Sequence, residues 1–170
     1  RLVLVCNLRF GEVFSLDKGG EENKPREFLN TEQKIILLPL PYGQNLTFEI
    51  LANMKEALGN AGTYKMYIRN HPLLGKKSLL QFLTQLRIEQ YKFADQGILQ
   101  DWLPRSFAVV SGGWSVTIIE AASMGIPVVR FTPANTFSLD PFADFEYPLP
   151  PVATPEDILQ QLLSIDSILV

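Results

Sequence analysis

The chain has 170 residues, of which 46% are hydrophobic and 19% are charged, and its formal net charge is −3. At about 100–200 residues per domain, this length predicts one domain with a sizeable core, and the composition excludes a disordered or collagen-like chain. The single cysteine, Cys6, cannot form an internal disulfide, and with the single histidine, His71, it cannot make a Cys/His zinc site.

Three further classes of protein are disfavoured. The mildly acidic balance lacks the basic surface that broad nucleic-acid binding needs, so we expect no nucleic-acid partner. No run approaches the ~18 apolar residues of a membrane-spanning helix, so we expect no transmembrane segment. No secretory signal peptide opens the chain, which begins on the apolar run Leu2–Cys6. A strand already under way there predicts an excised domain whose N-terminal partner domain is missing.

Five short apolar runs predict the strands of one sheet. In chain order they are Leu2–Cys6, Ile35–Leu40, Lys65–Arg69, Phe107–Val110 and Pro127–Phe131. Several runs are apolar at consecutive positions, which is typical of strands buried on both faces of a parallel sheet. Residues 11–34 contain a polar, charged stretch, and we predict a flexible loop or linker there.

Helical patterns separate these runs. Asn45 is predicted to cap the first helix and Gly59 to end it. The later helices are residues 79–86, a short piece Ile98–Leu103 ended by Pro104, Trp114–Met124 closed by Gly125, and a last helix capped by Thr154. The alternation predicts an α/β fold: a Rossmann-like, doubly wound, mainly parallel sheet of five or six strands flanked by helices.

The residues after the fourth run carry the strongest functional signal, because ligands of a doubly wound sheet bind at the carboxyl ends of its strands. Ser111, Gly112 and Gly113 form a predicted turn into a helix, so free N–H groups and the positive end of the helix dipole would face an anion. The glycines would let a phosphate approach the backbone. The hydroxyls of Ser111, Ser115 and Thr117 could donate hydrogen bonds to it.

Glu120 lies about one turn further into that helix, among apolar neighbours. A carboxylate is costly in such a setting unless it has a partner, and the two hydroxyl groups of a ribose would be a suitable one. A structural alternative stays open. The Ser-Gly-Gly turn would then be a plain helix start, with Thr117 and Glu120 forming a capping box.

The end of the third run carries a second signal, Arg69-Asn70-His71-Pro72. Pro72 favours an extended conformation for His71 at the tip of the strand. His71 and Arg69 could bind phosphate oxygens, with the imidazole donating a proton or a hydrogen bond to a leaving phosphate. The alternative is a strand-ending turn in which His71 caps a neighbouring loop. Tyr42, after the second run, could pack on a base or sugar, but a plain strand exit is the preferred interpretation there.

Four segments together resemble a known family: residues 7–10, 34–41, 69–72 and 111–129. They look like the C-terminal, donor-binding domain of GT-B glycosyltransferases, which have two facing Rossmann-like domains. Within that group the chain is most similar to bacterial surface-carbohydrate and capsule enzymes, including glycerophosphate and sialic acid polymerases, which carry a His-Pro pair. The resemblance implies that Glu120 binds the ribose and that His71 is catalytic at the leaving phosphate. It implies phosphate contacts for Ser111, Gly112, Gly113 and Ser115.

Two departures from the family pattern bear on the reaction. Many retaining members place a second glutamate eight residues before the ribose glutamate, where this chain has Gly112, and this disfavours a retaining mechanism. The sugar-nucleotide 2-epimerases also have a Ser-Gly-Gly turn before a Glu-containing helix, but with a spacing about one turn shorter than Gly113 to Glu120. A UDP-sugar 2-epimerase-like domain is therefore one alternative, and a non-catalytic Rossmann-like binding module is the other.

The resemblance implies that residues 1–170 form one nucleotide-sugar-binding domain of a glycosyltransferase for surface polysaccharide or glycolipid. The expected partners are a nucleotide-sugar, a carbohydrate or glycolipid acceptor, and the missing N-terminal acceptor domain. We expect no cofactor, and no metal because the sequence has no Asp-x-Asp cluster. The expected location is the cytoplasm, or the inner face of the membrane if the full-length protein is peripherally attached there. Alone, this domain is expected to bind nucleotide without turnover.

Overall fold

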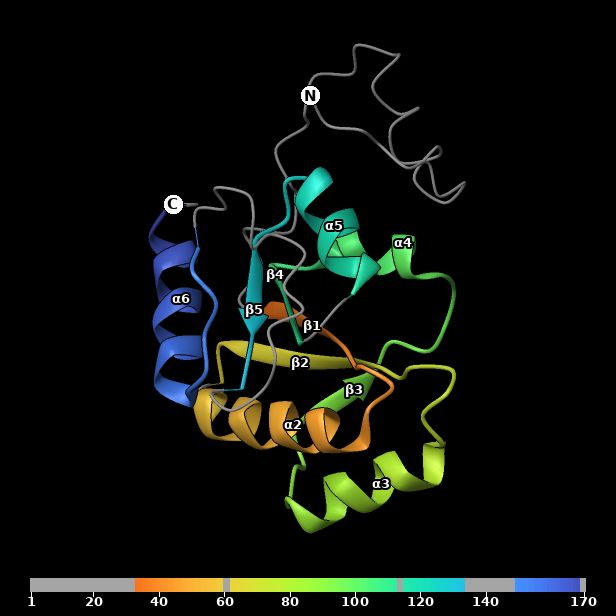
Figure 1. Ribbon diagram of the computed structural model, residues 1–170. Coiled ribbons are helices and arrows are strands. Elements are labelled where there is room, and N and C mark those ends of the chain that lie inside the picture. Colours follow the sequence, from red (N-terminus) through yellow and green to blue (C-terminus); the bar gives the residue numbers. More distant parts are fainter. Residues whose placement is uncertain (1–32, 60–61, 113–114, 134–148, 169–170) are drawn as a thin grey trace.

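The computed structural model describes residues 33–59, 62–112, 115–133 and 149–168, which are coloured in Figure 1. The predicted strand Leu2–Cys6 lies outside these residues, as does the predicted loop 11–34 apart from its last two positions. Of those two, Lys34 does not belong to a loop, because it begins the first strand of the sheet.

The described residues form one five-stranded sheet with the order β3-β2-β1-β4-β5. The strands are β1 (Lys34–Pro39), β2 (Tyr64–Arg69), β3 (Tyr91–Phe93), β4 (Ala108–Gly112) and β5 (Val128–Phe131). All neighbouring strands pair in parallel. The chain moves outward from β1 to β3 and then returns to place β4 on the other side of β1, so the sheet is doubly wound. The predicted Rossmann-like α/β fold is confirmed.

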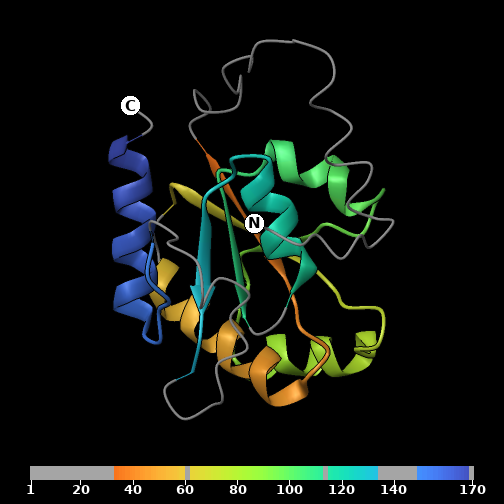
Figure 2. The ribbon, with the colours of Figure 1, turned by 45° about the horizontal axis from the view of Figure 1, so that its top comes forward.

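Helices cover both faces of the sheet (Figures 1 and 2). They are α2 (Gln44–Leu58), α3 (Lys76–Gln85), α4 (Leu99–Trp102), α5 (Val116–Ser123) and α6 (Pro155–Ile168), with a 3-10 helix at Leu103–Arg105. Buried residues of α2, α3 and α6 share one core, and those of α4 and α5 share a second core on the opposite face. Within the ranges that the structure describes, no helix is long and apolar enough to cross a membrane.

Strand residues alternate between these two cores. In β1, Ile36 and Leu38 belong to the core under α2 and α6, whereas Leu37 belongs to the core under α4 and α5. In β4, Val110 and Val109 divide in the same way. The side chains of these three residues of β1 and two residues of β4 are completely buried. Because both faces of the sheet are covered, a strand needs apolar residues at consecutive positions, as the sequence has them.

The sequence patterns do not predict β3. This strand has three residues, its central Lys92 is exposed, and it lies at the edge of the sheet beside β2. A short edge strand with a charged residue lacks the continuous apolar run that marks a buried strand. The described sheet therefore reaches five strands without the run Leu2–Cys6.

Two glycines and a threonine end or begin helices as predicted. Gly59 and Gly125 follow α2 and α5 with φ values of 46° and 66°, in the left-handed region that glycine adopts without strain. Thr154 precedes α6, and its Oγ1 accepts a hydrogen bond from the Asp157 amide at 3.2 Å. Such a cap satisfies one of the amides that have no partner within the helix.

Two other predicted helices have different bounds in the structure. The predicted helix 79–86 is α3, which begins at Lys76, and its Leu80 is 42% exposed although the pattern placed it on the apolar face. The predicted end at Pro104 is wrong, because the 3-10 helix continues from α4 to Arg105. Pro104 lies in the first turn of that 3-10 helix, where a missing N–H costs no hydrogen bond.

Candidate functional site

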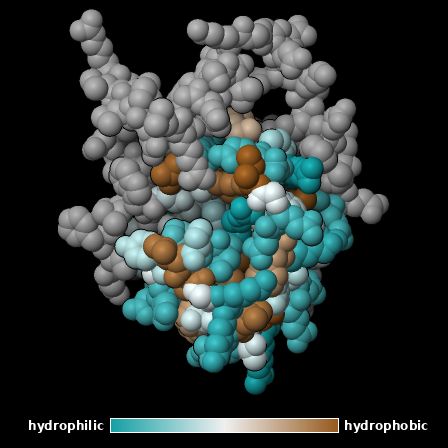
Figure 3. Space-filling view, turned by 90° about the vertical axis from the view of Figure 1, so that its right-hand side faces the viewer, coloured by the Kyte–Doolittle hydropathy of each residue, from teal (hydrophilic) through white to brown (hydrophobic). Residues whose placement is uncertain are grey.

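The carboxyl ends of β1 and β4 form the switch point of the sheet, where doubly wound proteins bind ligands. Ser111 Oγ donates a hydrogen bond to the Pro39 carbonyl at 3.5 Å, which joins the ends of the two strands. Each strand leads into a helix, β1 into α2 and β4 into α5. Figure 3 looks from the side of the loops that follow β1 and β2, where hydrophobic residues are interspersed with hydrophilic ones.

The N-terminus of α2 lies directly after the end of β1. Gly43 is its N-cap and has no side chain to bind the first amides. The first turn, residues 44–47, contains no acidic residue, so no carboxylate there neutralises the positive end of the helix dipole. Thr47 Oγ1 donates a hydrogen bond to the Pro41 carbonyl at 2.9 Å, which holds the β1–α2 loop against the helix.

Sequence reasoning missed this helix start. The predicted cap at Asn45 is wrong, because the N-cap is Gly43, two residues earlier, and α2 begins at Gln44. The loop around Tyr42 is the exit from β1, and it leads straight into α2, whose N-cap makes no side-chain hydrogen bond. The available signal was Gly43 after a buried run and ahead of a turn without Asp or Glu.

Ser111 and Gly112 lie in β4 and not in the predicted turn. β5 extends the pairing beyond the predicted end of the strand, with Ser111 opposite Arg130 and Gly112 opposite Phe131. Because every residue of this extension finds a hydrogen-bonded neighbour in β5, the strand ends two residues later than the apolar run. The Ser111 side chain is only 1% exposed, and its hydroxyl donates to the Pro39 carbonyl. Contact between this hydroxyl and a phosphate stays a prediction.

Gly112 occupies a place where even the first carbon of a side chain would fit tightly. A Cβ atom there would lie 3.3 Å from the Phe131 carbonyl oxygen, 3.4 Å from Leu46 Cδ1 and 3.6 Å from Ile50 Cδ1. The shortest of these contacts requires a neighbour to move by a few tenths of an ångström, whereas 3.6 Å is an ordinary van der Waals distance. The close approach of α2 to β4 therefore gives a packing explanation for the glycine, and its predicted phosphate contact stays a prediction.

The helix α5 begins at the other side of the switch point. Ser115 is its N-cap, with φ −136° and ψ 122°, and Thr117 is its second residue. The capping-box alternative for Thr117 and Glu120 is therefore wrong, because Thr117 lies inside the helix. Glu120 is completely buried, in the second turn. Gly113 lies outside the described residues.

His71 follows β2 and lies beside the β1–α2 loop. Its Nδ1 accepts a hydrogen bond from the Leu73 amide at 3.1 Å, and its carbonyl accepts one from the Leu74 amide at 2.9 Å. Its ring centroid is 5.9 Å from that of Tyr42. One ring nitrogen, Nδ1, thus stabilises the turn that follows β2, in keeping with the turn-capping alternative. The contact with Tyr42 also places His71 beside the loop that leads into α2.

Arg69 binds the loop that follows β3. One terminal nitrogen of its guanidinium donates a hydrogen bond to the Ala94 carbonyl, and the other donates to the Gly97 carbonyl at 3.0 Å. These bonds hold the end of β2 to the segment that leads into α4, a role that the sequence does not indicate. Phosphate binding by Arg69 stays a prediction.

Replacing Arg69 by alanine is expected to lower the free energy of unfolding by about 1–2 kcal/mol, because two carbonyls lose a charged donor. Arg69→Lys is the matched control: it keeps the charge but cannot form the two-pronged contact, so its loss should be intermediate. Denaturation in urea measures all three proteins. Equal stability of the alanine variant and the unaltered chain would contradict the role of these bonds.

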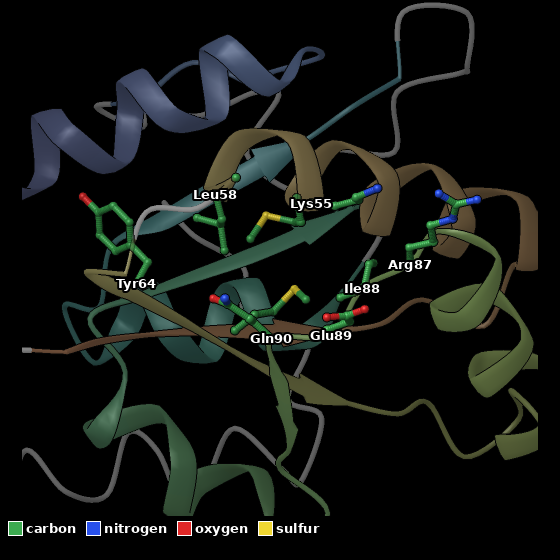
Figure 4. Close-up of a pocket in the computed structure, with 10 residues that line it drawn as sticks. Lys55, Leu58, Tyr64, Arg87, Ile88, Glu89 and Gln90 are labelled. Carbon is green, nitrogen blue, oxygen red and sulfur yellow. The ribbon is translucent and has the colours of Figure 1, made fainter.

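A cavity of about 220 Å³ lies away from this edge, near the amino end of β2 (Figure 4). Lys55 and Arg87 lie toward one end of it and Tyr64 toward the other. Burial, and secondarily the Asp166 carboxylate, raises the pKa of the Tyr64 hydroxyl above its ordinary value of 10.0. The residues that line the cavity include none of the predicted site residues. Among the described residues, no group of three or more His, Cys, Asp or Glu side chains could hold a metal ion.

No family model matches the sequence, and no curated protein matches it significantly. Similar solved structures include the UDP-GlcNAc 2-epimerase of Methanocaldococcus jannaschii in complex with UDP-GlcNAc and UDP, with 14% identity and a TM-score of 0.57. A mutant of S. aureus TarM, in complex with fondaparinux, alpha-GlcNAc-glycerol and UDP, has 17% identity and a TM-score of 0.59. The C-terminal domain of LpcC, a glycosyl transferase group 1 family protein from Francisella tularensis, has 18% identity and a TM-score of 0.52.

These matches cover most of this chain but differing shares of the other proteins. They cover 92% of this chain and 44% of the epimerase, 87% and 31% for TarM, and 86% and 83% for the LpcC domain. The chain thus spans less than half the length of the epimerase and of TarM. At these identities the likeness is one of fold, and this chain has the Rossmann-like fold of a UDP-GlcNAc 2-epimerase domain and of a glycosyl transferase group 1 C-terminal domain.

Proposed function

We propose that this chain is the nucleotide-sugar-binding domain of a glycosyltransferase that acts in surface polysaccharide or glycolipid synthesis. One observation carries the proposal: α2 and α5 begin after the carboxyl ends of adjacent strands, β1 and β4, at the switch point of the sheet. The likeness in fold to the C-terminal domain of a glycosyl transferase group 1 family protein supports it.

Two helix starts follow adjacent strand ends at one edge of the sheet, and such starts suit the anionic oxygens of a diphosphate. The first amides of a helix have no carbonyl partner within it, and the helix dipole places partial positive charge at the same end. Neither first turn, residues 44–47 or 116–119, contains Asp or Glu. Anionic oxygens of a nucleoside diphosphate would therefore meet N–H donors from both helices without repulsion from a carboxylate in either first turn.

The same groups would assist departure of the nucleotide. When the bond between the sugar and the phosphate oxygen breaks, negative charge grows on that oxygen, and fixed donors around it stabilise the charge. The Ser115 and Thr117 hydroxyls and the His71 ring are the side-chain donors that we assign to this role. The acceptor site and any general base would belong to the N-terminal domain that we expect beside this one, so the chain alone would bind nucleotide without turnover.

Two of the similar structures contain UDP, which makes UDP the first ligand to test. We expect the chain to bind at least one of UDP, CDP, CMP and GDP. Bound nucleotide should raise the melting temperature, because a ligand at 100 times its Kd adds about 2.7 kcal/mol to the free energy of unfolding. In amide NMR spectra the signals of residues 44–46 and 115–117 should show the largest changes in chemical shift.

The nucleoside without phosphates is the matched control for each nucleotide. Uridine should bind far more weakly than UDP, because the proposed helix contacts are all to phosphate. Failure of all four nucleotides to bind would contradict the proposal and favour the non-catalytic module. The epimerase alternative predicts selectivity for UDP and, in the full-length protein, conversion of a UDP-sugar without any acceptor.

A further inference from the structure

We propose that the cavity near the amino end of β2 binds a small aromatic carboxylate, with the ring against its apolar floor and the anionic group beside Lys55 and Arg87. This cavity lies away from the edge that we assign to the nucleotide. The helix α2 connects the two places, since it begins at Gln44, beside the proposed phosphate contact, and ends at Leu58, which lines the cavity. The inference does not rest on the proposed function.

The floor of the cavity is apolar. Met54, Leu58, Met66 and Ile88 line it, and all four are buried. They come from α2, from β2 and from the segment between α3 and β3. Methionine sulfur makes favourable contacts with aromatic rings, and the flexible side chain adapts to their shape. A cavity of about 150 Å³ can hold benzene, so a volume of about 220 Å³ has room for a ring that carries a carboxylate.

Two exposed cations, Lys55 and Arg87, lie toward one end of the cavity (Figure 4). In the part of the chain that the structure describes, neither side chain has an ion pair or a hydrogen bond. Like charges at one end of a cavity repel each other, and an anion bound there offsets the repulsion. The guanidinium also presents paired N–H groups that match the two oxygens of a carboxylate.

The backbone of Arg87 is an independent reason to assign an anion to this place. The helix α3 ends in a Schellman motif, in which the Arg87 amide donates to the Thr84 carbonyl at 3.0 Å and the Ile88 amide donates to the Leu83 carbonyl at 2.9 Å. Such a motif places a residue with positive φ after the helix, usually glycine, and Arg87 has a φ of 52° there. This conformation is strained for arginine. A bound carboxylate would offset the strain through the side chain.

The ends of two helices also favour these cations. Lys55 is in the last turn of α2, and Arg87 follows α3, so each lies near the negative end of a helix dipole. The dipoles explain a positive charge at each helix end, but they do not require that both cations line one cavity. Glu89 lines the cavity too and would oppose an anion. With two positive groups against one negative group, the lining still favours an anion over a cation.

Methionine methyl signals can report binding at the cavity directly. The chain has three methionines. Met54 and Met66 line the cavity, whereas Met124 packs against the core on the opposite face of the sheet. In 13C spectra of the chain labelled at its methionine methyl groups, benzoate at constant ionic strength should shift the Met54 and Met66 signals. The Met124 signal should stay in place.

Three further probes separate the parts of the ligand. Benzyl alcohol keeps the ring without the charge, acetate keeps the carboxylate without the ring, and benzylamine reverses the charge. Each should bind about tenfold more weakly than benzoate or worse, because each loses either the apolar contact or the charged one.

Arg87→Gly separates the ligand contact from the fold. Glycine adopts a positive φ without strain, so we expect the melting temperature to rise by about 2–4 °C. Benzoate binding should weaken by about tenfold, because the carboxylate loses a charged partner. Lys77→Gln is the matched control: it removes an exposed cation from the other end of α3 and should leave benzoate binding unchanged.

Three results would overturn the inference. The first is that benzoate leaves the Met54 and Met66 signals in place, or shifts the Met124 signal equally. The second is that benzyl alcohol or benzylamine binds as tightly as benzoate, since the cavity would then not recognise an anion. The third is that Arg87→Gly binds benzoate as the unaltered chain does, since Arg87 would then serve the helix end alone. These measurements use no nucleotide, so they succeed or fail independently of the proposed function.

Discussion

Replacing Gly112 by valine is expected to lower the free energy of unfolding by about 2–3 kcal/mol. Even the first carbon of a side chain would lie 3.3 Å from the Phe131 carbonyl oxygen and 3.4 Å from Leu46 Cδ1. The two further carbons of valine would enlarge this conflict, so β4 and α2 would have to separate. Denaturation in urea measures the change.

Gly62→Val is the matched control, because a Cβ atom at Gly62 would meet nothing within 4 Å. It should change stability by less than about 0.5 kcal/mol, as for other surface substitutions. Gly112→Ala then separates the two explanations of this glycine. If the alanine variant is destabilised and still binds nucleotide, packing explains the glycine. If its stability is unchanged and nucleotide binding is lost, the phosphate explanation is right and packing is not the cause.

The second large effect is expected at Glu120. Glu120→Gln should weaken nucleotide binding by about tenfold or more, because hydrogen bonds to a charged group contribute about 1.5–3 kcal/mol. Glutamine keeps the size of the side chain and one acceptor oxygen but removes the charge that two ribose hydroxyls would bind. Since Glu120 is completely buried in α5, the folding of the variant must be checked by thermal denaturation before its binding is interpreted.

A change in the ligand tests the ribose contact directly. The unaltered chain should bind UDP more tightly than 2′-deoxy-UDP, and this preference should shrink in Glu120→Gln. Glu156→Gln, in the first turn of α6 and exposed, is the matched control and should leave both affinities unchanged. A preference for UDP that survives in Glu120→Gln would show that Glu120 does not bind the ribose.

The sequence predicted the buried strands well and the edge of the sheet poorly. Ile36, Leu37 and Leu38 are apolar in succession because each faces one of two cores, and such runs are visible without a structure. Lys92 in β3 faces no such requirement, since an edge strand of three residues is defined by its hydrogen bonds to β2. Backbone pairing at an edge leaves no hydrophobic pattern to read.

The sequence predicted the edge of the sheet to which several candidate site residues belong, but not the contacts that they make there. Predicted residues after β2 and β4 do lie at one edge of the sheet, since parallel strands end on the same side. The helix start at Gly43 was overlooked, because its N-cap has no side chain and its first turn has no acidic residue. The usual sequence signals of a helix start are therefore absent there. The hydrogen bonds of Arg69 to Ala94 and Gly97 could not be anticipated either, because those partners are 25 and 28 residues away in the chain.

By itself, the sequence determined the alternation of strands and helices and the parallel sheet buried on both faces. It also determined the two glycines that end helices and the threonine that begins one. These properties are local: each depends on residues within one or two turns of a helix or along one strand. Only the tertiary structure decided that β4 continues to Gly112, that α2 packs against that glycine, and that Tyr42 and Leu73 together hold the His71 ring. Such contacts join segments far apart in the chain or depend on the shape of one turn, and no residue pattern records them.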